Sequence, residues 1–162
     1  MFKAATLART CLAGFALVVL SASLAQAQYG PRTKIGKNYQ QWSETTSTNG
    51  INPSFCNGNT TCYVLFQRTP QGQQLIVQHV ACRATVTTGG LTLVRLGTRK
   101  GPTFQNRNTP LVPVYTTGNY WAVNSPVMHL LKSGERPYVF FFNSTAATWG
   151  LDCSISGRLQ QP

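Results

Sequence analysis

Apolar and polar residues alternate along most of the chain after residue 55, with the period of two that is typical of half-buried β-strands. Runs rich in Val, Leu, Phe, Tyr and Thr recur between turn residues and span 62–66, 74–86, 91–96, 111–115, 119–124, 127–131, 138–142 and 151–159, with the clearest alternation around Cys82 and Cys153. Beyond residue 27, no window repeats apolar residues at helical spacing. The pattern predicts an all-β protein, a single-domain antiparallel β-sandwich of jelly-roll or other Greek-key type.

Three segments depart from simple alternation. Residues 97–108 are rich in Gly, Pro and Asn, which predicts a loop, and 125–126 (Ser-Pro) predicts a break between two strands. Residues 138–142 are apolar on both faces, which indicates a central strand or one that a loop covers. An immunoglobulin-type sandwich fits less well, because Trp121 follows Cys82 too late in the chain.

The N-terminus has the parts of a secretory signal peptide. Lys3 and Arg9 give it a positive start, and residues 11–20 are apolar. Residues 21–27 are small or polar and end in an Ala-Gln-Ala cleavage pattern. A transmembrane anchor is the alternative, but the apolar run is about half the ~20 residues that span a bilayer. We expect cleavage after Ala27, no membrane-spanning segment in the mature chain, and a secreted or periplasmic protein.

Residues 28–54 are polar and follow no clear period. We expect them to form an irregular N-terminal arm or irregular edge strands, followed by the β-sandwich domain over 55–162. Arg32, Lys34 and Lys37 form a group of positive charges in this segment.

Removal of the leader leaves four cysteines, an even number. An exported chain of this kind is expected to hold two disulfides, and four cysteines allow three pairings. Cys56 and Cys62 enclose a turn-rich loop, while Cys82 and Cys153 lie on the apolar faces of two alternating runs. We therefore expect the bridges Cys56–Cys62 and Cys82–Cys153, the second joining two facing strands. The spacing does not match a zinc knuckle or ribbon.

The charged residues are few and mostly basic. The 162 residues include 14 Lys and Arg against 3 Asp and Glu, the formal net charge is +11, and 42% of residues are hydrophobic. Glu44, Glu135 and Asp152 supply all the carboxylate side chains, and no pattern places two of them across a cleft. His79 and His129 are interpreted as surface or hydrogen-bonded structural residues, because no nucleophile motif accompanies them. We expect no enzymatic activity, no cofactor and no metal site.

Positive charge concentrates in one part of the chain. Residues 95–107 contain no acid but carry several basic side chains and an aromatic ring, which together could hold an anionic polymer. The candidate contact residues are Arg95, Arg99, Lys100, Phe104 and Arg107. A solvated basic surface that only keeps the protein soluble is the alternative.

Aromatic residues near turns and strand ends give a second candidate surface. Exposed Trp and Tyr rings can stack on sugars through their apolar faces. Tyr120 and Trp121 are the candidates for such a platform, with Trp42 and Trp149 in similar positions. Filling of the core is the alternative for all of them.

These features indicate an exported, non-catalytic binding module for an anionic or glycan component of the cell envelope. The alternative is a structural or interaction protein that assembles through edge strands or through its N-terminal arm. We expect a monomer, and no specific nucleic-acid partner, because the chain has no recognition motif and is expected to be exported.

Mass spectrometry of the exported protein tests the leader and the disulfides together. We expect a mature chain that begins at Gln28 and, without reductant, four cysteines that alkylating reagents do not modify. Two free thiols would contradict the disulfide scheme, and a chain that begins at Met1 would contradict the leader.

Overall fold

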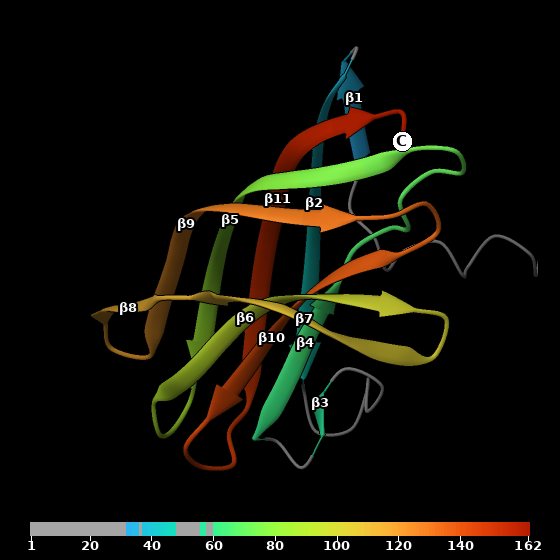
Figure 1. Cartoon of the computed structure of the whole chain (residues 1–162). Coiled ribbons are helices and arrows are strands. Elements are labelled where there is room, and N and C mark those ends of the chain that lie inside the picture. Colours follow the sequence, from blue (N-terminus) through green and yellow to red (C-terminus); the bar gives the residue numbers. More distant parts are fainter. Residues whose placement is uncertain (1–31, 36, 48–55, 58–59) are drawn as a thin grey trace, which may run out of the picture.

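The computed structural model describes residues 32–35, 37–47, 56–57 and 60–162. The described residues form strands and no helix, in two antiparallel sheets (Figure 1). The strands are β1 (Arg32–Ile35), β2 (Asn38–Ser47), β3 (Cys56–Asn57), β4 (Thr61–Leu65), β5 (Gln74–Val86), β6 (Leu91–Lys100), β7 (Thr103–Leu111), β8 (Pro113–Thr117), β9 (Tyr120–Leu131), β10 (Arg136–Asn143) and β11 (Trp149–Gln160). The prediction of an all-β, antiparallel protein is confirmed.

The two sheets bury a shared apolar core. One sheet has the order β1-β2-β11-β5-β9-β8, and the other has the order β3-β4-β10-β6-β7. Buried side chains of both sheets meet in one cluster, which includes Leu75, Val80, Leu151 and Ile155 of the first sheet and Val64, Val94, Leu96 and Phe141 of the second. Each such side chain contributes about 1.5–3 kcal/mol when it leaves water, so this cluster is the main stabilising feature of the fold.

Residues 38–47 form a regular inner strand, so the expectation of an irregular arm is wrong for this part of the chain. Strand β2 pairs with β11 from Asn38 to Ser47 without a break. Its inward side chains make hydrogen bonds: the Tyr39 hydroxyl donates to Gln41 Oε1 (2.6 Å), and the Ser43 hydroxyl donates to the Leu65 carbonyl (2.9 Å). The Nε2 of Gln41 is buried without a partner among the described residues. Because hydrogen bonds replace apolar contacts here, the strand has no apolar alternation that a sequence pattern could reveal.

The predicted loop over 97–108 is also wrong. Strands β6 and β7 run through it and turn at Gly101, whose φ of 58° lies in the left-handed region. Gly97 serves packing, because a Cβ at this position would overlap the ring of Tyr138. Likewise, β9 continues through 125–126, where the sequence predicted a break.

A β-bulge shifts the alternation of β5. The register of β5 against β9 changes between Val77 and His79. Leu75 and Val77 are buried before the bulge, and Val80 is buried after it. One extra residue reverses which positions face the core. Strict alternation would place Ile76 on the same side as Val80, but the bulge puts it on the other side.

The Cys82–Cys153 disulfide is confirmed, with a Cα–Cα distance of 4.1 Å. It joins neighbouring strands of one sheet, because Cys82 of β5 pairs directly with Cys153 of β11. The expectation of facing strands is therefore wrong. The backbone of Cys56 pairs with that of Cys62 in β3 and β4, but the Cys56 side chain lies outside the described residues, so that bridge stays a prediction.

The expected leader over 1–27 lies outside the described residues, and its cleavage stays a prediction. Within the part of the chain that the structure describes, no helix is long and apolar enough to cross a membrane.

Gly157 should be the least replaceable of the glycines in β11. A Cβ at Gly157 would overlap the carbonyl of Ile76, whereas a Cβ at Gly150 would make an ordinary contact of 3.7 Å with Thr85. We expect Gly157→Ala to lower the free energy of unfolding by about 1–3 kcal/mol, and Gly150→Ala to change it by less than about 0.5 kcal/mol. Urea denaturation of both variants measures this, and equal losses would contradict the described approach of β11 to β5.

Candidate functional site

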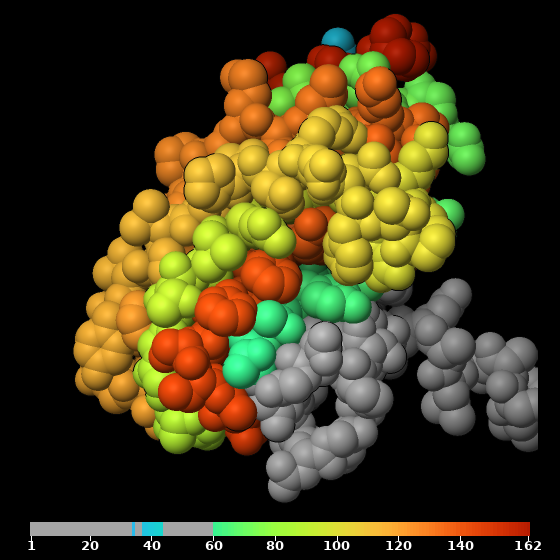
Figure 2. Space-filling model, turned by 60° about the horizontal axis from the view of Figure 1, so that its bottom comes forward, coloured from blue at the N-terminus to red at the C-terminus, as the bar shows by residue number. Residues whose placement is uncertain are grey.

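The outer face of the five-stranded sheet carries aromatic and arginine side chains side by side. Strand β10 is central in this sheet, and its outward residues pair in register with those of β4 and β6: Phe140 with both Tyr63 and Arg95. Farther along, Arg99 of β6 pairs with Phe104 of β7. Strands β4, β10, β6 and β7 lie next to one another in Figure 2. We call Tyr63, Arg95, Arg99, Phe104, Tyr138 and Phe140 the aromatic–arginine face.

Each of the two arginines lies over an aromatic ring. The Cζ of Arg95 is 4.7 Å from the ring centre of Phe140, and the Cζ of Arg99 is 5.1 Å from that of Phe104. A guanidinium attracted to a ring face keeps its N–H donors at its own edge, where they can still meet an acceptor. The Nε of Arg95 is buried and has no hydrogen-bond partner among the described residues.

The rings hold one another in edge-to-face contacts. The ring centre of Phe104 lies 5.0 Å from that of Tyr138 and 5.6 Å from that of Tyr63. The Tyr138 hydroxyl donates to Asn108 Oδ1 (3.2 Å), which fixes the ring above Gly97. Burial raises the pKa of Tyr138, with an opposing effect of the Arg95 charge, so this hydroxyl stays protonated and keeps donating. Phe104 remains 45% exposed, which leaves one ring of the cluster open to a ligand.

The face is positively charged. Arg136 of β10 pairs with Arg99 of β6. None of the described residues that point outward from β4, β6, β7 and β10 has a carboxylate. Guanidinium groups bind carboxylate and phosphate oxygens through paired N–H donors, and exposed rings stack on apolar surfaces such as those of sugars. The face therefore offers N–H donors for anionic oxygens and a ring on which an apolar surface can stack.

Two of the basic residues proposed from the sequence lie elsewhere. Arg107 points to the opposite side of β7, where its guanidinium contacts Glu135 Oε2 at 2.6 Å and the Leu130 carbonyl at 2.9 Å. Lys100 is exposed and follows Arg99 directly, so strand alternation turns its side chain away from the aromatic–arginine face. Arg107 therefore joins β7 to the β9–β10 connection. Of the five candidate residues, Arg95, Arg99 and Phe104 lie on the aromatic–arginine face.

Three members of the face, Tyr63, Tyr138 and Phe140, were missed by sequence reasoning. The signal for two of them was the apolar run at 138–142, and the prediction of a central strand there is confirmed. On the outer side of this strand, the Arg95 and Phe104 side chains lie against the rings of Phe140 and Tyr138. The apolar run points to this face only when 97–108 forms a hairpin that lies beside β10, which the sequence pattern did not predict.

A buried polar group lies behind the face, between β6, β7 and β9. His129 Nε2 is 2.8 Å from the Thr98 hydroxyl, and His129 Nδ1 is 2.9 Å from the Thr109 hydroxyl. Burial lowers the pKa of His129, and the Arg107 charge lowers it further, against an opposing effect of Glu135. His129 is thus held neutral by its surroundings, in a structural role.

Glu135 is the buried carboxylate of this region. Burial alone would raise its pKa, but the backbone N–H of Lys132 (2.7 Å) and the Arg107 guanidinium outweigh burial, and the pKa is lowered. Glu135 therefore stays charged and anchors Arg107.

Tyr120 and Trp121 do not form a common platform. They are consecutive in β9, so their side chains point to opposite faces of the sheet. Tyr120 is 39% exposed and lies under the Arg83 guanidinium at 4.6 Å, whereas Trp121 packs against the core and contacts Tyr115 edge-to-face at 5.3 Å. Trp149 is buried in the core.

Trp42 is exposed on the outer face of the six-stranded sheet. It borders a shallow hollow of about 340 Å³ together with Arg83, Asp152 and Ser154. The hollow has charges of both signs, so it does not share the basic character of the aromatic–arginine face.

Within the described ranges, no three His, Cys, Asp or Glu side chains gather in a way that could hold a metal ion. No protein-family model matches the chain, and no curated protein matches it as a relative. Any proposal about function must therefore rest on the residues and their geometry.

Acid should destabilise the protein through His129. Its pKa is lowered in the folded state, so the unfolded chain takes up the proton first as the pH falls below about 6.5. We expect the Tm to fall between pH 7 and pH 5.5, and His129→Gln to remove most of that fall. His79→Gln is the matched control and should retain it. An unchanged fall in His129→Gln would show that burial of His129 does not cause the acid sensitivity.

Proposed function

We propose that the protein is an exported, non-catalytic binding module whose aromatic–arginine face binds an anionic polymer or glycan of the cell envelope. The observation that carries this proposal is the pair of arginines, Arg95 and Arg99, each lying over an aromatic ring on a face without a described carboxylate. Such a face offers charge and stacking to the same ligand.

The spacing of the two arginines favours a polymer over a small ion. Arg95 and Arg99 lie four positions apart on β6, which corresponds to about 13 Å at ~3.3 Å per residue. Each guanidinium also stays over its own ring, so one carboxylate or phosphate is not expected to contact both groups in this arrangement. An extended chain with repeated anionic groups can, and Phe104 gives it a ring to stack on.

Other features are compatible with this proposal. We propose that the mature chain begins at Gln28, that it holds a second bridge between Cys56 and Cys62, and that it is exported. The Cys82–Cys153 disulfide is compatible with an oxidising compartment. The jelly-roll type is supported by the strand orders β2-β11-β5-β9 and β4-β10-β6-β7. These eight strands divide into two packed sheets of four, as the strands of a jelly roll do.

Assembly through an edge strand is the second candidate function. Strand β8 lies at the edge of the six-stranded sheet. It and the residue before it expose apolar side chains: Val112 is 72% exposed, Val114 58% and Tyr115 55%. Open apolar edges favour pairing with another chain. The N-terminal segment that contains β2 supports this candidate less, because β2 already pairs with β1 on one side and with β11 on the other.

Binding of the oxidised protein to an acidic and a neutral polysaccharide, each at low and high salt, tests the proposal. We expect saturable binding to the acidic polymer that weakens with salt as counterions compete. Arg99→Ala should weaken it about tenfold or more, the effect of losing a charge-assisted hydrogen bond. Lys100→Ala removes the same charge next to the face and should weaken binding less than about twofold.

Three outcomes would contradict the proposal. Equal losses in Arg99→Ala and Lys100→Ala would indicate attraction to net charge alone. Salt-resistant binding to the neutral polymer that needs Tyr120 or Trp121 would move the site to β9. An absence of binding, together with concentration-dependent self-association, would favour assembly through β8.

A further inference from the structure

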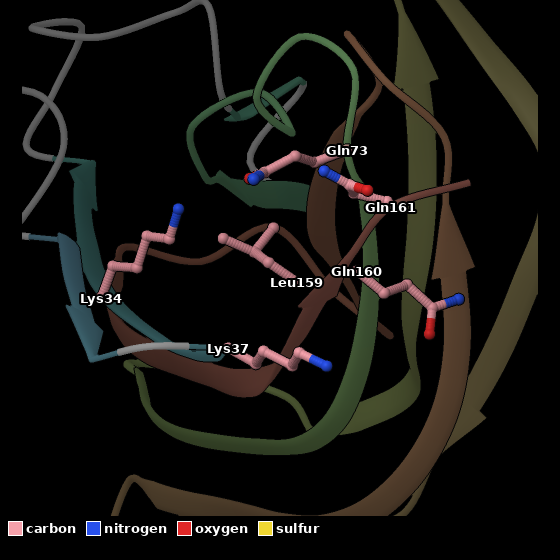
Figure 3. A pocket seen from close by; sticks show the side chains of 6 residues that line it. All are labelled: Lys34, Lys37, Gln73, Leu159, Gln160 and Gln161. Atoms are coloured by element: carbon pink, nitrogen blue, oxygen red, sulfur yellow. The ribbon is translucent and has the colours of Figure 1, made fainter.

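A second pocket lies away from the aromatic–arginine face, at one end of the six-stranded sheet. Its volume is about 460 Å³, within the range of small-molecule sites, and its lining residues are Lys34, Lys37, Gln73, Leu159, Gln160 and Gln161 (Figure 3). They come from the β1–β2 hairpin, the residue before β5, and the end of β11 with the residue after it.

Hydrogen bonds of the backbone and of two glutamine side chains fix the parts of this pocket relative to one another. The Leu159 N–H donates to the Lys37 carbonyl (2.8 Å), which ties the hairpin to the end of β11. The Gln73 N–H donates to the Pro70 carbonyl (3.2 Å), and Gln160 Nε2 donates to Gln74 Oε1 (3.3 Å). The pocket is therefore formed by paired strands and a hydrogen-bonded turn, so its shape is largely present before a ligand binds.

The lining offers three kinds of contact. Lys34 and Lys37 are exposed ammonium groups, and no carboxylate is among the described residues of the lining. Leu159 gives an apolar floor. The Oε1 of Gln73 is buried and has no hydrogen-bond partner in the part of the chain that the structure describes. Figure 3 shows the ends of Lys34 and Gln73 directed toward the space over Leu159, while Lys37 and Gln160 point away from it along the rim.

These contacts set requirements for a ligand. The ammonium of Lys34 can donate to an anionic acceptor. The Gln73 amide needs a hydroxyl, which satisfies it in either orientation of the amide because a hydroxyl both donates and accepts. A bare anion cannot donate to Gln73 Oε1, and a neutral sugar leaves the lysines unpaired. The apolar face of a sugar ring fits the floor at Leu159.

We propose that this pocket binds a monosaccharide unit that carries a negative charge, as a carboxylate or a phosphate. Lys34 pairs with the anionic group, Gln73 hydrogen-bonds a ring hydroxyl, and Leu159 contacts the apolar side of the ring. The site shares no residue with the aromatic–arginine face, so it does not depend on the function proposed for that face.

Titration of the full oxidised protein, followed by NMR at low salt, tests this site. The probes are D-glucuronate, D-glucose 6-phosphate, D-glucose and inorganic phosphate. We expect one or both acidic sugars to shift the amide signals around Lys34, Gln73 and Leu159 and to saturate. Glucose and inorganic phosphate should bind at least tenfold more weakly. The two acidic sugars distinguish a carboxylate site from a phosphate site.

Variants locate the binding and separate it from the first site. Lys34→Ala and Gln73→Leu should each weaken the acidic sugar about fivefold or more, whereas Lys100→Ala, which removes one distant lysine, should leave it unchanged. Arg95→Ala should reduce polymer binding and leave the titration of the acidic sugar intact. Gln73→Glu provides a second test at the same position, because its carboxylate should repel the acidic sugar if Gln73→Leu fails to fold.

Several results would overturn the proposal. Inorganic phosphate that binds as tightly as the acidic sugars would reduce the pocket to an anion site. Binding that survives both Lys34→Ala and Gln73→Glu would place the ligand elsewhere. An absence of saturable shifts would reject the site, while polymer binding at the aromatic–arginine face could still hold.

Discussion

The central strand of the five-stranded sheet, β10, has apolar side chains on both faces, and both faces must be shielded from water. Val139 and Phe141 are shielded by the other sheet. On the outer side no second layer of the described chain covers the strand, and shielding comes from Arg95 over Phe140 and from Phe104 against Tyr138. The same contacts that limit exposure of these rings bring guanidinium groups together on an open surface. The shielding of β10 and the proposed binding thus depend on one set of interactions.

The alternation of side chains along the strands sorts the basic residues into different roles. Phe104 and Arg107 are three positions apart on β7, an odd separation, so they point to opposite faces. Arg107 turns inward and neutralises Glu135, a carboxylate that would be costly to bury alone. Arg99 turns outward with Phe104. A cluster of positive charge in the sequence is therefore divided between a structural ion pair and a candidate binding face.

The sequence predicted most of the strands and the Cys82–Cys153 pair, because apolar alternation is strong in β5 and β11. It missed β2, where the buried Gln41 Oε1 and the Ser43 hydroxyl make hydrogen bonds that no hydropathy pattern contains. Glycine and proline at 97–108 suggested a loop, although Gly97 makes room for the Tyr138 ring. Such packing between strands distant in the sequence cannot be read from local composition. Of the five candidates proposed over residues 95–107, Arg95, Arg99 and Phe104 do lie on one face. The rings of Tyr63, Tyr138 and Phe140 that complete this face could be identified only from the pairing register of β4, β10 and β6.

The NMR signals of the arginine Nε–H groups, followed while an acidic polysaccharide is added, report whether Arg95 and Arg99 contact the polymer. We expect the signals of these two arginines to shift and saturate together, while that of Arg107, held by Glu135 and the Leu130 carbonyl, stays in place. Shifts of similar size at arginines all over the molecule, or a shift confined to Arg83 beside Tyr120, would contradict this expectation.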